Sequence, residues 1–271
     1  AIFMKKTDIL TGVGLVACFG VVIYGIIQGG PLRLFWDVAS IYITFGGSIA
    51  ALLMTYSMEE LKNMGKLAVQ AFKETKSSTM EIIVQFGDLS KKARREGLLS
   101  LEDDISQMDD QFLKKGLQMV VDGIEPETIK EILELEIGEM ETRHGRGIGI
   151  FSAWAAYGPA FGMLGTLIGL IQMLANVSDV SSITKGMGVA LITTFYGSVI
   201  ANMICLPIAS NLREKSAKEV GEREMKLEGI LSIQSGVNPR IVEEKLMTYL
   251  QPTEKLEYLN NSIQGDKGVV I

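Results

Sequence analysis

Two long stretches without a charged residue constrain the fold of this chain more than any other feature. They cover residues 147–178 and 186–212, and the short loop between them contains Asp179 and Lys185. Each stretch is longer than the ~20 apolar residues that an α-helix needs to cross a lipid bilayer. Glycine, serine and threonine recur within both, and such small residues allow helices to pack closely in a membrane. We therefore expect a pair of membrane-spanning helices that pack against other protein.

The remaining apolar residues are also separated from the charged ones. Of the 271 residues, 47% are hydrophobic and 21% are charged, and two further apolar stretches lie near the start of the chain, at 9–27 and about 36–56. These stretches are continuously apolar, whereas the strands of a membrane β-barrel alternate between apolar and polar residues. The sequence therefore predicts an all-α, polytopic membrane protein with four transmembrane helices and a helical cytoplasmic domain.

Charged blocks divide the chain into four consecutive segments. We expect transmembrane helices 1 and 2 in residues 1–57, a cytoplasmic helical domain in 58–146, transmembrane helices 3 and 4 in 147–212, and cytoplasmic helices with a tail in 213–271.

Local patterns predict the elements of the cytoplasmic segments. Apolar side chains spaced by three or four residues predict helices at 79–96 and 109–121. Pro126, followed by an acidic residue, is typical of the first position of a helix. Asn238, followed by Pro239, is expected to cap a final short helix at 240–250. We interpret the glycine-rich segment 145–149 as a flexible junction before the third span. Residues from 252 onward are interpreted as an irregular tail.

Lysine and arginine residues near the spans determine the expected orientation. They are frequent before the first span, around the large charged block and after the fourth span, whereas the two short loops hold only Arg33 and Lys185. Positive residues favour the cytoplasmic side of a membrane. Both termini and the large block are therefore expected in the cytoplasm.

The chain has few residues suited to catalysis or metal binding. Its single histidine, His144, can form neither a histidine-based metal site nor a catalytic triad, and the HExxH, GxSxG and GxxxxGK[ST] motifs are absent. We interpret His144 as a surface residue near the membrane. The net charge of −6 argues against nucleic-acid binding. We expect no enzymatic activity, no cofactor and no metal site.

Polar residues of the third and fourth spans permit two interpretations. Thr166, Thr193 and Thr194 lie well inside the apolar stretches, and Pro159 and Pro207 leave backbone carbonyls without their usual partners. The hydroxyls can bond across the helix contact or to their own helix, with the prolines bending it. Alternatively, hydroxyl and carbonyl oxygens line a route for an ion. Spacing alone favours packing, and both interpretations stay open.

Three segments resemble the MotA/PomA family of flagellar stator subunits, which belongs with the ExbB- and TolQ-type energisers. They are YGPAFGMLGTLIGL (157–170), ALITTFYGSVIANMICLPIA (190–209) and KKARREGLLSLEDD (91–104). The resemblance covers nearly the whole chain. It implies a homopentamer in the bacterial inner membrane, arranged around a dimer of a MotB- or PomB-type partner with one membrane helix and a peptidoglycan-binding domain. Ion flow through this complex would drive rotation against the rotor protein FliG and so support motility.

The resemblance also implies roles for the membrane residues. Pro159 and Pro207 match the functional prolines of the family, and Thr166 and Thr194 match the hydroxyls near the ion in its sodium-type members. With its neighbour Thr193, this set forms the expected ion pathway. Whether the transported ion is a proton or sodium stays open.

A second group of residues matches the charges with which the family contacts the rotor. Arg94 and Glu102 occupy these positions, and Arg95 is a neighbouring candidate. Charge clusters on cytoplasmic helices are usually only solvated surface. Here basic residues come first and acidic residues follow, which suits a reversible contact with a partner of complementary charge.

Two other classes of function compete with the stator. One is a self-contained membrane transporter or channel, and the other is an ExbB/TolQ-like energiser of an envelope system. The stretches 147–178 and 186–212 contain no Asp, Glu, Lys, Arg or His. We therefore expect the ion-carrying group on a partner helix, as an aspartate packed against Pro159, Thr166 and Thr194. Asp37 is the alternative within this chain, although its position at the end of a span is typical of a helix N-cap.

Overall fold

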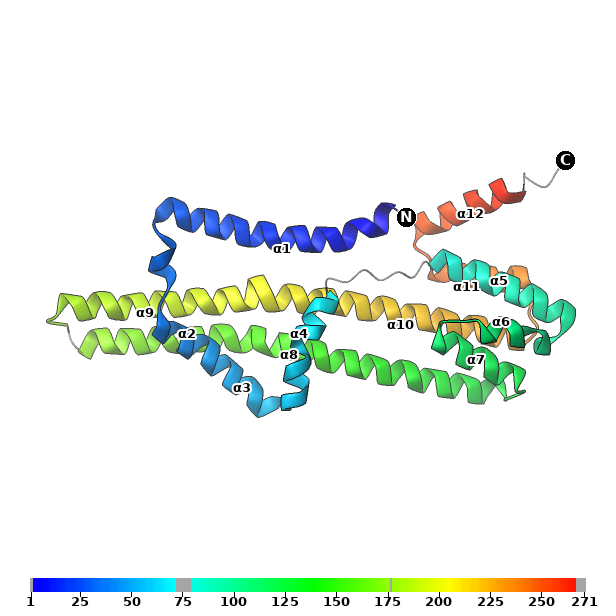
Figure 1. Ribbon diagram of the computed structural model, residues 1–271, viewed down its shortest axis with the longest axis horizontal. Helices are drawn as coiled ribbons and strands as arrows, with labels where there is room; N and C mark the ends of the chain where they lie inside the picture. Colours follow the sequence, from blue (N-terminus) through cyan, green and yellow to red (C-terminus); the bar gives the residue numbers. More distant parts are fainter. Residues whose placement is uncertain (1, 72–78, 176, 267–271) are drawn as a thin grey trace. The chain divides into compact units, whose positions relative to one another are not determined.

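The computed structural model describes residues 2–71, 79–175 and 177–266, and their side chains from 12 to 259 (Figure 1). The α-helices are α1 (Ile2–Gly29), α2 (Val38–Ile41), α3 (Gly47–Thr55), α4 (Met58–Ala71), α5 (Thr79–Glu96), α6 (Glu102–Ser106), α7 (Gln111–Val121), α8 (Pro126–Ala175), α9 (Val180–Ser198), α10 (Leu206–Gln234), α11 (Pro239–Leu246) and α12 (Pro252–Asp266). Short 3-10 helices are η1 (Leu32–Phe35), η3 (Leu98–Leu101) and η5 (Met247–Tyr249), and π-helices are η2 (Tyr42–Gly46) and η4 (Val199–Cys205). Within the described ranges there is no strand, so the all-α prediction is confirmed.

Four helical segments are long and apolar enough to cross a membrane, which confirms the predicted number of spans. The first is Gly12–Gly29 of α1, and the second is Val38–Thr55, where α2, η2 and α3 follow one another without a break. The third and fourth lie within α8 and within the continuous segment of α9, η4 and α10.

The third span is continuous with the helix that precedes it. Pro126 starts α8, as predicted, and the helix then runs through the glycine-rich segment to Ala175. The predicted flexible junction at 145–149 is therefore wrong. A Cβ atom on Gly147 would lie 3.0 Å from the Leu67 side chain, and one on Gly149 would lie 3.2 Å from the Tyr56 hydroxyl. Because these glycines of α8 lack a side chain, the neighbouring Leu67 and Tyr56 can approach the helix closely.

A π-helical segment precedes Pro207 in the fourth span. In η4 the N–H group of Leu206 bonds to the carbonyl of Ala201, five residues earlier. Proline cannot donate a hydrogen bond, so Pro207 makes no backbone bond to an earlier carbonyl of this helix. The wider π turn at this point accommodates the missing bond, and α10 continues beyond the proline.

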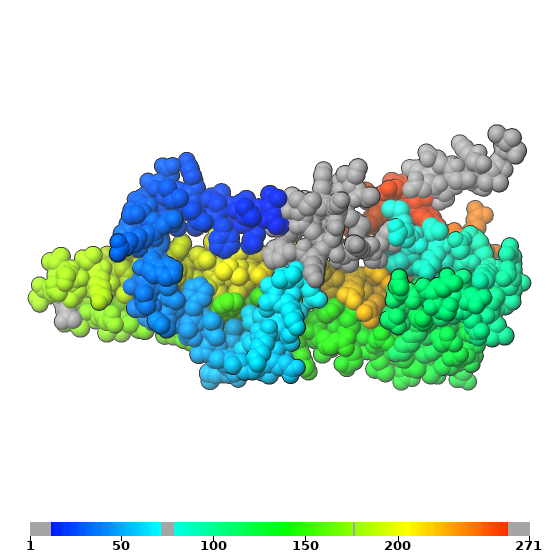
Figure 2. Space-filling view, viewed as in Figure 1, coloured from blue at the N-terminus to red at the C-terminus, as the bar shows by residue number. Residues whose placement is uncertain are grey.

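The described residues form two compact units. One comprises the described residues within 1–74 and 143–215 and contains the four spans with α4. Figure 2 shows the side chains of the second span, in blue, packed on α9, in yellow-green. In this unit, three residues at four-residue spacing in the second span are completely buried: Ser40, Thr44 and Ser48.

The other unit comprises the described residues within 75–142 and 216–271. Its apolar core has contributions from α5, α7, α8, α10 and α11, and Phe86, Leu117, Leu133 and Ile230 are completely buried in it. The predicted helices at 79–96 and 109–121 correspond to α5 and α7, and Asn238 caps α11 as expected. The prediction of an irregular tail from residue 252 is wrong as far as Asp266, because α12 occupies this segment. Residues 267–271 of that prediction lie outside the described residues.

Candidate functional site

The α8–α9 contact brings the two backbones together. A Cβ atom on Gly162 would lie 2.8 Å from the carbonyl oxygen of Thr193, and one on Gly197 would lie 2.7 Å from that of Gly158. Further along, a Cβ atom on Gly169 would lie 2.5 Å from the carbonyl oxygen of Gly186. In all three places the obstacle is backbone, which cannot move aside as a flexible side chain can. The predicted close packing of these spans is therefore confirmed.

Thr166 of α8 and Thr194 of α9 meet across this contact. Their hydroxyl oxygens are 2.5 Å apart, and they lie 3.1 and 3.2 Å from the carbonyl oxygen of Ala190. The Thr166 hydroxyl is also 3.1 Å from the carbonyl oxygen of Gly162. Each hydroxyl has one hydrogen and two acceptor lone pairs. One hydrogen joins the two threonines and the other goes to a carbonyl, so the pair keeps unused acceptor capacity.

The two threonines retain a surface that other groups can reach. The Thr194 residue is exposed and Thr166 is half-buried, whereas the neighbouring glycines are buried in the contact. An uncharged cluster of hydroxyl and carbonyl oxygens can bind a cation or accept hydrogen bonds from a protonated group. It has no proton-transferring or anionic group of its own.

Thr193 lies at a different place in the same contact. Its side chain is completely buried, and its hydroxyl donates to the carbonyls of Val189 or Ala190, at 2.8 and 3.1 Å. A Cβ atom on Gly165 would collide with the Thr193 side chain. The structure thus brings Thr166 and Thr194 together and places Thr193 in the packed interior between the helices. Its expected role in an ion pathway stays a prediction.

The two prolines occupy separate surroundings. Pro159 lies inside α8, where its Cα atom would be 3.0 Å from a Cβ atom on Gly197 of α9. Pro207 instead lines an apolar cavity of about 250 Å³ whose other walls include Cys18 of α1 and Ala71 of α4. Pro159 therefore lies in the same α8–α9 contact as the threonine pair, about two helical turns from Thr166. Pro207 faces other elements of this unit.

Asp37 caps the helix that begins the second span. Its carboxylate accepts hydrogen bonds from the Ser40 backbone N–H, at 2.7 Å, and from the Ser40 hydroxyl, at 2.6 Å. The predicted N-cap is confirmed.

Tyr196 is a residue of this region that the sequence analysis missed. Its hydroxyl donates to the carbonyl of Phe35 at 2.5 Å and accepts the Asp37 backbone N–H at 3.4 Å. The ring of Phe35 also meets that of Phe195 edge-on, with centroids 5.4 Å apart. A tyrosine inside an otherwise apolar span was the available signal, since a buried phenol normally finds a hydrogen-bond partner.

The charged segment 91–104 forms the junction of α5, η3 and α6. Arg94 and Arg95 lie in the last turn of α5, and Glu102 lies in the first turn of α6. This order also suits the dipoles of the two helices. All three side chains are exposed. Arg95 pairs with Glu96 at 3.0 Å, whereas among the described residues no ion pair engages Arg94 or Glu102.

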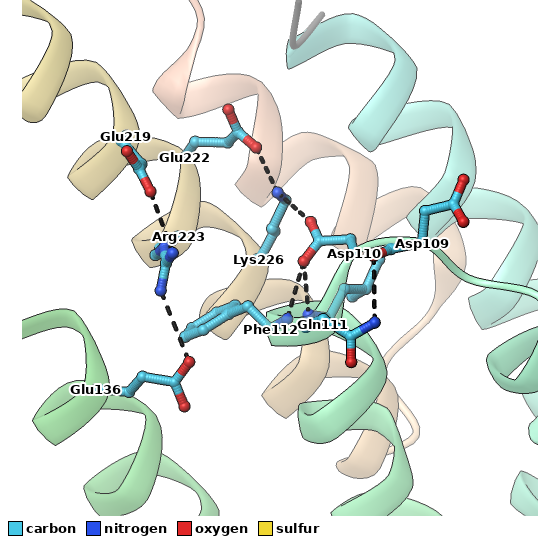
Figure 3. Close-up of polar contacts among 10 residues, drawn as sticks. Asp109, Asp110, Gln111, Phe112, Glu136, Glu219, Glu222, Arg223 and Lys226 are labelled. Atoms are coloured by element: carbon cyan, nitrogen blue, oxygen red, sulfur yellow. Dashed lines mark hydrogen bonds and ion pairs between the residues drawn. The ribbon is translucent and has the colours of Figure 1, made fainter. Parts of the chain in front are cut away.

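A buried ionic cluster holds the start of α7 to α10 (Figure 3). The ammonium group of Lys226 is 2.5 Å from the Asp110 carboxylate and also pairs with Glu222, and its side chain is only 8% exposed. Asp110 is at the same time the N-cap of α7, where it accepts from the backbone N–H groups of Phe112 and Leu113. The guanidinium of Arg223 stacks 5.2 Å from the Phe112 ring.

The pKa values in this cluster reflect opposed effects. Burial by itself raises the pKa of Asp110, but hydrogen bonds from Lys226 and from the α7 backbone outweigh it, so the pKa is lower than usual. Burial likewise lowers the pKa of Lys226, and the bonds to Asp110 and Glu222 outweigh it, so that pKa is raised. Both groups are therefore charged at neutral pH, and the cluster links the start of α7 to α10.

Known proteins similar to this chain decide its family. Residues 104–225 match the MotA/TolQ/ExbB proton channel family, and residues 12–97 match the Motility protein A N-terminal family. Motility protein A of Borreliella burgdorferi is 44% identical over 235 residues, which make up 87% of this chain and 90% of that protein. The chain belongs to the MotA/PomA family of flagellar stator subunits.

Two further relatives are similar to this chain over nearly its whole length. Chemotaxis protein PomA of Vibrio alginolyticus is 36% identical over 243 residues, or 90% of this chain and 95% of that protein. The solved structure of the flagellar MotAB stator complex from Bacillus subtilis matches with a TM-score of 0.83 and 34% identity, covering 93% of this chain and 99% of that chain. The N-terminal match places this MotA/PomA-family protein in the motility branch, apart from the ExbB/TolQ-like alternative.

Proposed function

We propose that this stator subunit conducts protons or sodium ions together with a single-span partner of the MotB/PomB type, and that the complex converts ion motive force into torque. The observation that carries the proposal is the Thr166–Thr194 pair, which offers oxygen atoms without any charge. It lies in a close contact of two spans whose apolar stretches contain no Asp, Glu, Lys, Arg or His.

The missing charge explains why a partner is needed. A cation crossing a potential of 100 mV gains about 2.3 kcal/mol, and coupling this energy to motion requires a group whose charge changes with ion occupancy. A carboxylate neutralised by a proton or by sodium is such a group, because a charge in hydrocarbon is costly. The aspartate of the partner helix is proposed to lie against the surface of Pro159, Thr166 and Thr194.

Not every residue of the proposed pathway has the same task. Thr166 and Thr194 present accessible hydroxyls, while the buried Thr193 sets the distance between the helices through Gly165. Pro159 leaves a free carbonyl on the α8 side of this contact. Pro207 is proposed to permit bending of the fourth span next to its π-helical segment.

The exposed charges of α5 and α6 are proposed as the surface that contacts the rotor protein FliG. Arg94 and Glu102 have no ion pair within the part of the chain that the structure describes, and Arg95 lies beside them. Uncommitted charges favour rapid, reversible association with a complementary surface. This proposal places both termini and the charged unit in the cytoplasm and the spans in the bacterial inner membrane, with the subunits forming a pentamer.

Co-expression with the partner tests this proposal. The chain is produced in motile bacteria that lack their own stator genes, with and without a tagged MotB/PomB-type subunit. We expect the chain to co-purify with the tagged subunit and swimming to recover only when both are present. Swimming restored by this chain alone, or a partner that never co-purifies with it, would contradict the proposed complex.

A further inference from the structure

The turn of α9 that carries Thr194 is attached to the loop before the second span. The Tyr196 hydroxyl donates to the Phe35 carbonyl at 2.5 Å and accepts from the Asp37 backbone N–H at 3.4 Å. Ring contacts surround these bonds, since Phe35 meets Phe195 at 5.4 Å and Phe45 meets Tyr196 at 6.0 Å between centroids. One phenol thus satisfies two backbone groups at the point where the second span begins.

The same turn is fixed on its other side by α8. Thr194 bonds to Thr166, and Gly197 touches the backbone at Gly158. Successive residues of an α-helix are rotated by about 100°, so Thr194 and Tyr196 project about 200° apart. One therefore faces α8 while the other faces the loop. A shift of this turn toward or away from the loop must change the distance between the two threonine hydroxyls.

The position of this attachment along α9 is also informative. Tyr196 lies about 24 Å beyond the start of α9 at Val180, at a rise of about 1.5 Å per residue. The loop at Phe35–Asp37 nevertheless contacts α9 there, next to Thr194, and the start of α9 lies far from it along the helix. The hydrogen bonds of Tyr196 therefore restrain the part of α9 that carries Thr194.

We propose that Tyr196 is a positioning residue, whose hydroxyl holds Thr194 at the right distance from Thr166 by tying α9 to the loop before the second span. The inference rests on the proposed function, because it makes ion affinity depend on this tie. The phenol does not touch the ion. Its loss leaves the Phe35 carbonyl and the Asp37 N–H without this partner and releases one side of the turn.

The first test is Tyr196→Phe, which removes only the hydroxyl. Swimming speed is measured against external sodium at fixed pH, and against pH at fixed sodium. For the ion that drives the wild type, we expect the half-maximal concentration to rise about fivefold, the change produced by one net hydrogen bond, with the maximal speed preserved. Tyr42→Phe is the matched control, because Tyr42 lies in the second span, is 74% exposed and should show no shift. An unchanged half-maximal concentration in Tyr196→Phe, or an equal shift in Tyr42→Phe, would overturn the proposal.

A second measurement tests the contact between the Phe35 loop and α9 independently of swimming. In a background with Cys18→Ser and Cys205→Ala, Phe35→Cys and Phe195→Cys are combined and oxidised in native membranes. We expect a disulfide within one chain, and a several-fold lower yield when Tyr196→Phe is added. An undiminished yield would show that the hydroxyl does not hold the loop, whatever the swimming result. If the wild type shows no ion-dependent swimming but this yield falls, the proposed function fails while the tie itself stands.

Discussion

At the scale of single residues, the proposed ion pathway depends most directly on the hydroxyl pair. Thr166 and Thr194 share a 2.5 Å contact, and both are near the Ala190 carbonyl. Oxygen ligands in such an arrangement suit a partly dehydrated hard cation, and they suit equally a chain of water molecules that carries protons. The distinction is therefore one of function and needs a functional measurement.

Thr166→Ala is predicted to impair swimming at low external sodium several-fold more than at high sodium, because it removes one oxygen from the pair. The speed of swimming cells across a sodium series measures this. Thr184→Ala is the control, since the Thr184 hydroxyl donates to the Val180 carbonyl of its own helix at 2.9 Å. Full motility of the wild type in sodium-free medium would instead assign the hydroxyls to packing or to a proton route.

Lys226→Met is predicted to destabilise the unit within 75–142 and 216–271 by about 3–5 kcal/mol. The reason is that Asp110 and Glu222 both lose their ion pair with the buried Lys226 ammonium group. Thermal unfolding of the purified chain measures this change. Lys130→Met is the control, since that lysine is exposed and pairs with Glu134 only at 3.8 Å. Equal loss of stability in the two variants would show that the buried cluster does not stabilise the contact of α7 with α10.

The same cluster sets a pH dependence with two limits. The lowered pKa of Asp110 contributes stability that is present above its ordinary value of 3.8 and is lost as the pH falls through the lowered pKa. The raised pKa of Lys226 contributes stability below 10.5 that is lost as the pH rises through the raised pKa. Between these values the contribution of the pair is constant, and Lys226→Met should remove its alkaline limit.

At the scale of elements, glycines in α8 act through the neighbours they admit. Gly162 has the Thr193 carbonyl where its Cβ would be, whereas Gly138 in the same helix has open space around that position. Gly162→Ala is therefore predicted to disrupt assembly of the spans and abolish swimming. Gly138→Ala should be neutral or stabilise by about 0.5–1 kcal/mol, because alanine favours a helix interior. Membrane levels and swimming of the two variants check this, and a functional Gly162→Ala protein would contradict the close contact.

The exposed charges at the α5–α6 junction give a second prediction at this scale. Arg94→Glu combined with Glu102→Lys should leave expression and membrane assembly intact, because exposed charges contribute only ~0–1 kcal/mol to stability. Swimming should be impaired and partly restored by compensating charge reversals on FliG. Lys130→Glu serves as a control on another exposed helix surface. A loss of protein in place of motility would assign Arg94 and Glu102 a structural role.

Element boundaries show what the sequence can and cannot predict. The four spans, α5, α7 and the starts of α8 and α11 follow from local signals such as apolar spacing, Pro126 and Asn238. The glycines at 147 and 149 led to the wrong prediction of a flexible junction. They are in close contact with Leu67 and Tyr56, and no local sequence pattern reveals these contacts. The two π-helical segments likewise depend on packing within the spans.

The candidate site divides in the same way. Thr166 and Thr194 were found because they interrupt apolar stretches and match a family motif, and their meeting across α8 and α9 follows from the small residues around them. Tyr196 and Lys226 were missed because their partners are distant in sequence, 161 residues away for Phe35 and 116 for Asp110. Only the tertiary structure brings such pairs together.

At the scale of the whole molecule, the two central spans supply uncharged oxygen atoms to the proposed ion pathway, and no charged group. The apolar stretches at 147–178 and 186–212 contain no acidic or basic residue, and Asp37 is engaged as a helix cap. A self-contained transporter would need its own titratable group near the middle of the membrane. The stator account therefore depends on a carboxylate that a partner helix supplies.

Ion flux in reconstituted vesicles tests this dependence most directly. Three preparations are compared under an imposed voltage: this chain alone, this chain with its single-span partner, and this chain with a partner whose membrane aspartate is changed to asparagine. We predict flux of the driving ion only in the second preparation, because only there is the carboxylate present beside Thr166 and Thr194. Robust voltage-driven flux in the first or the third would contradict the shared site and favour a self-contained transporter.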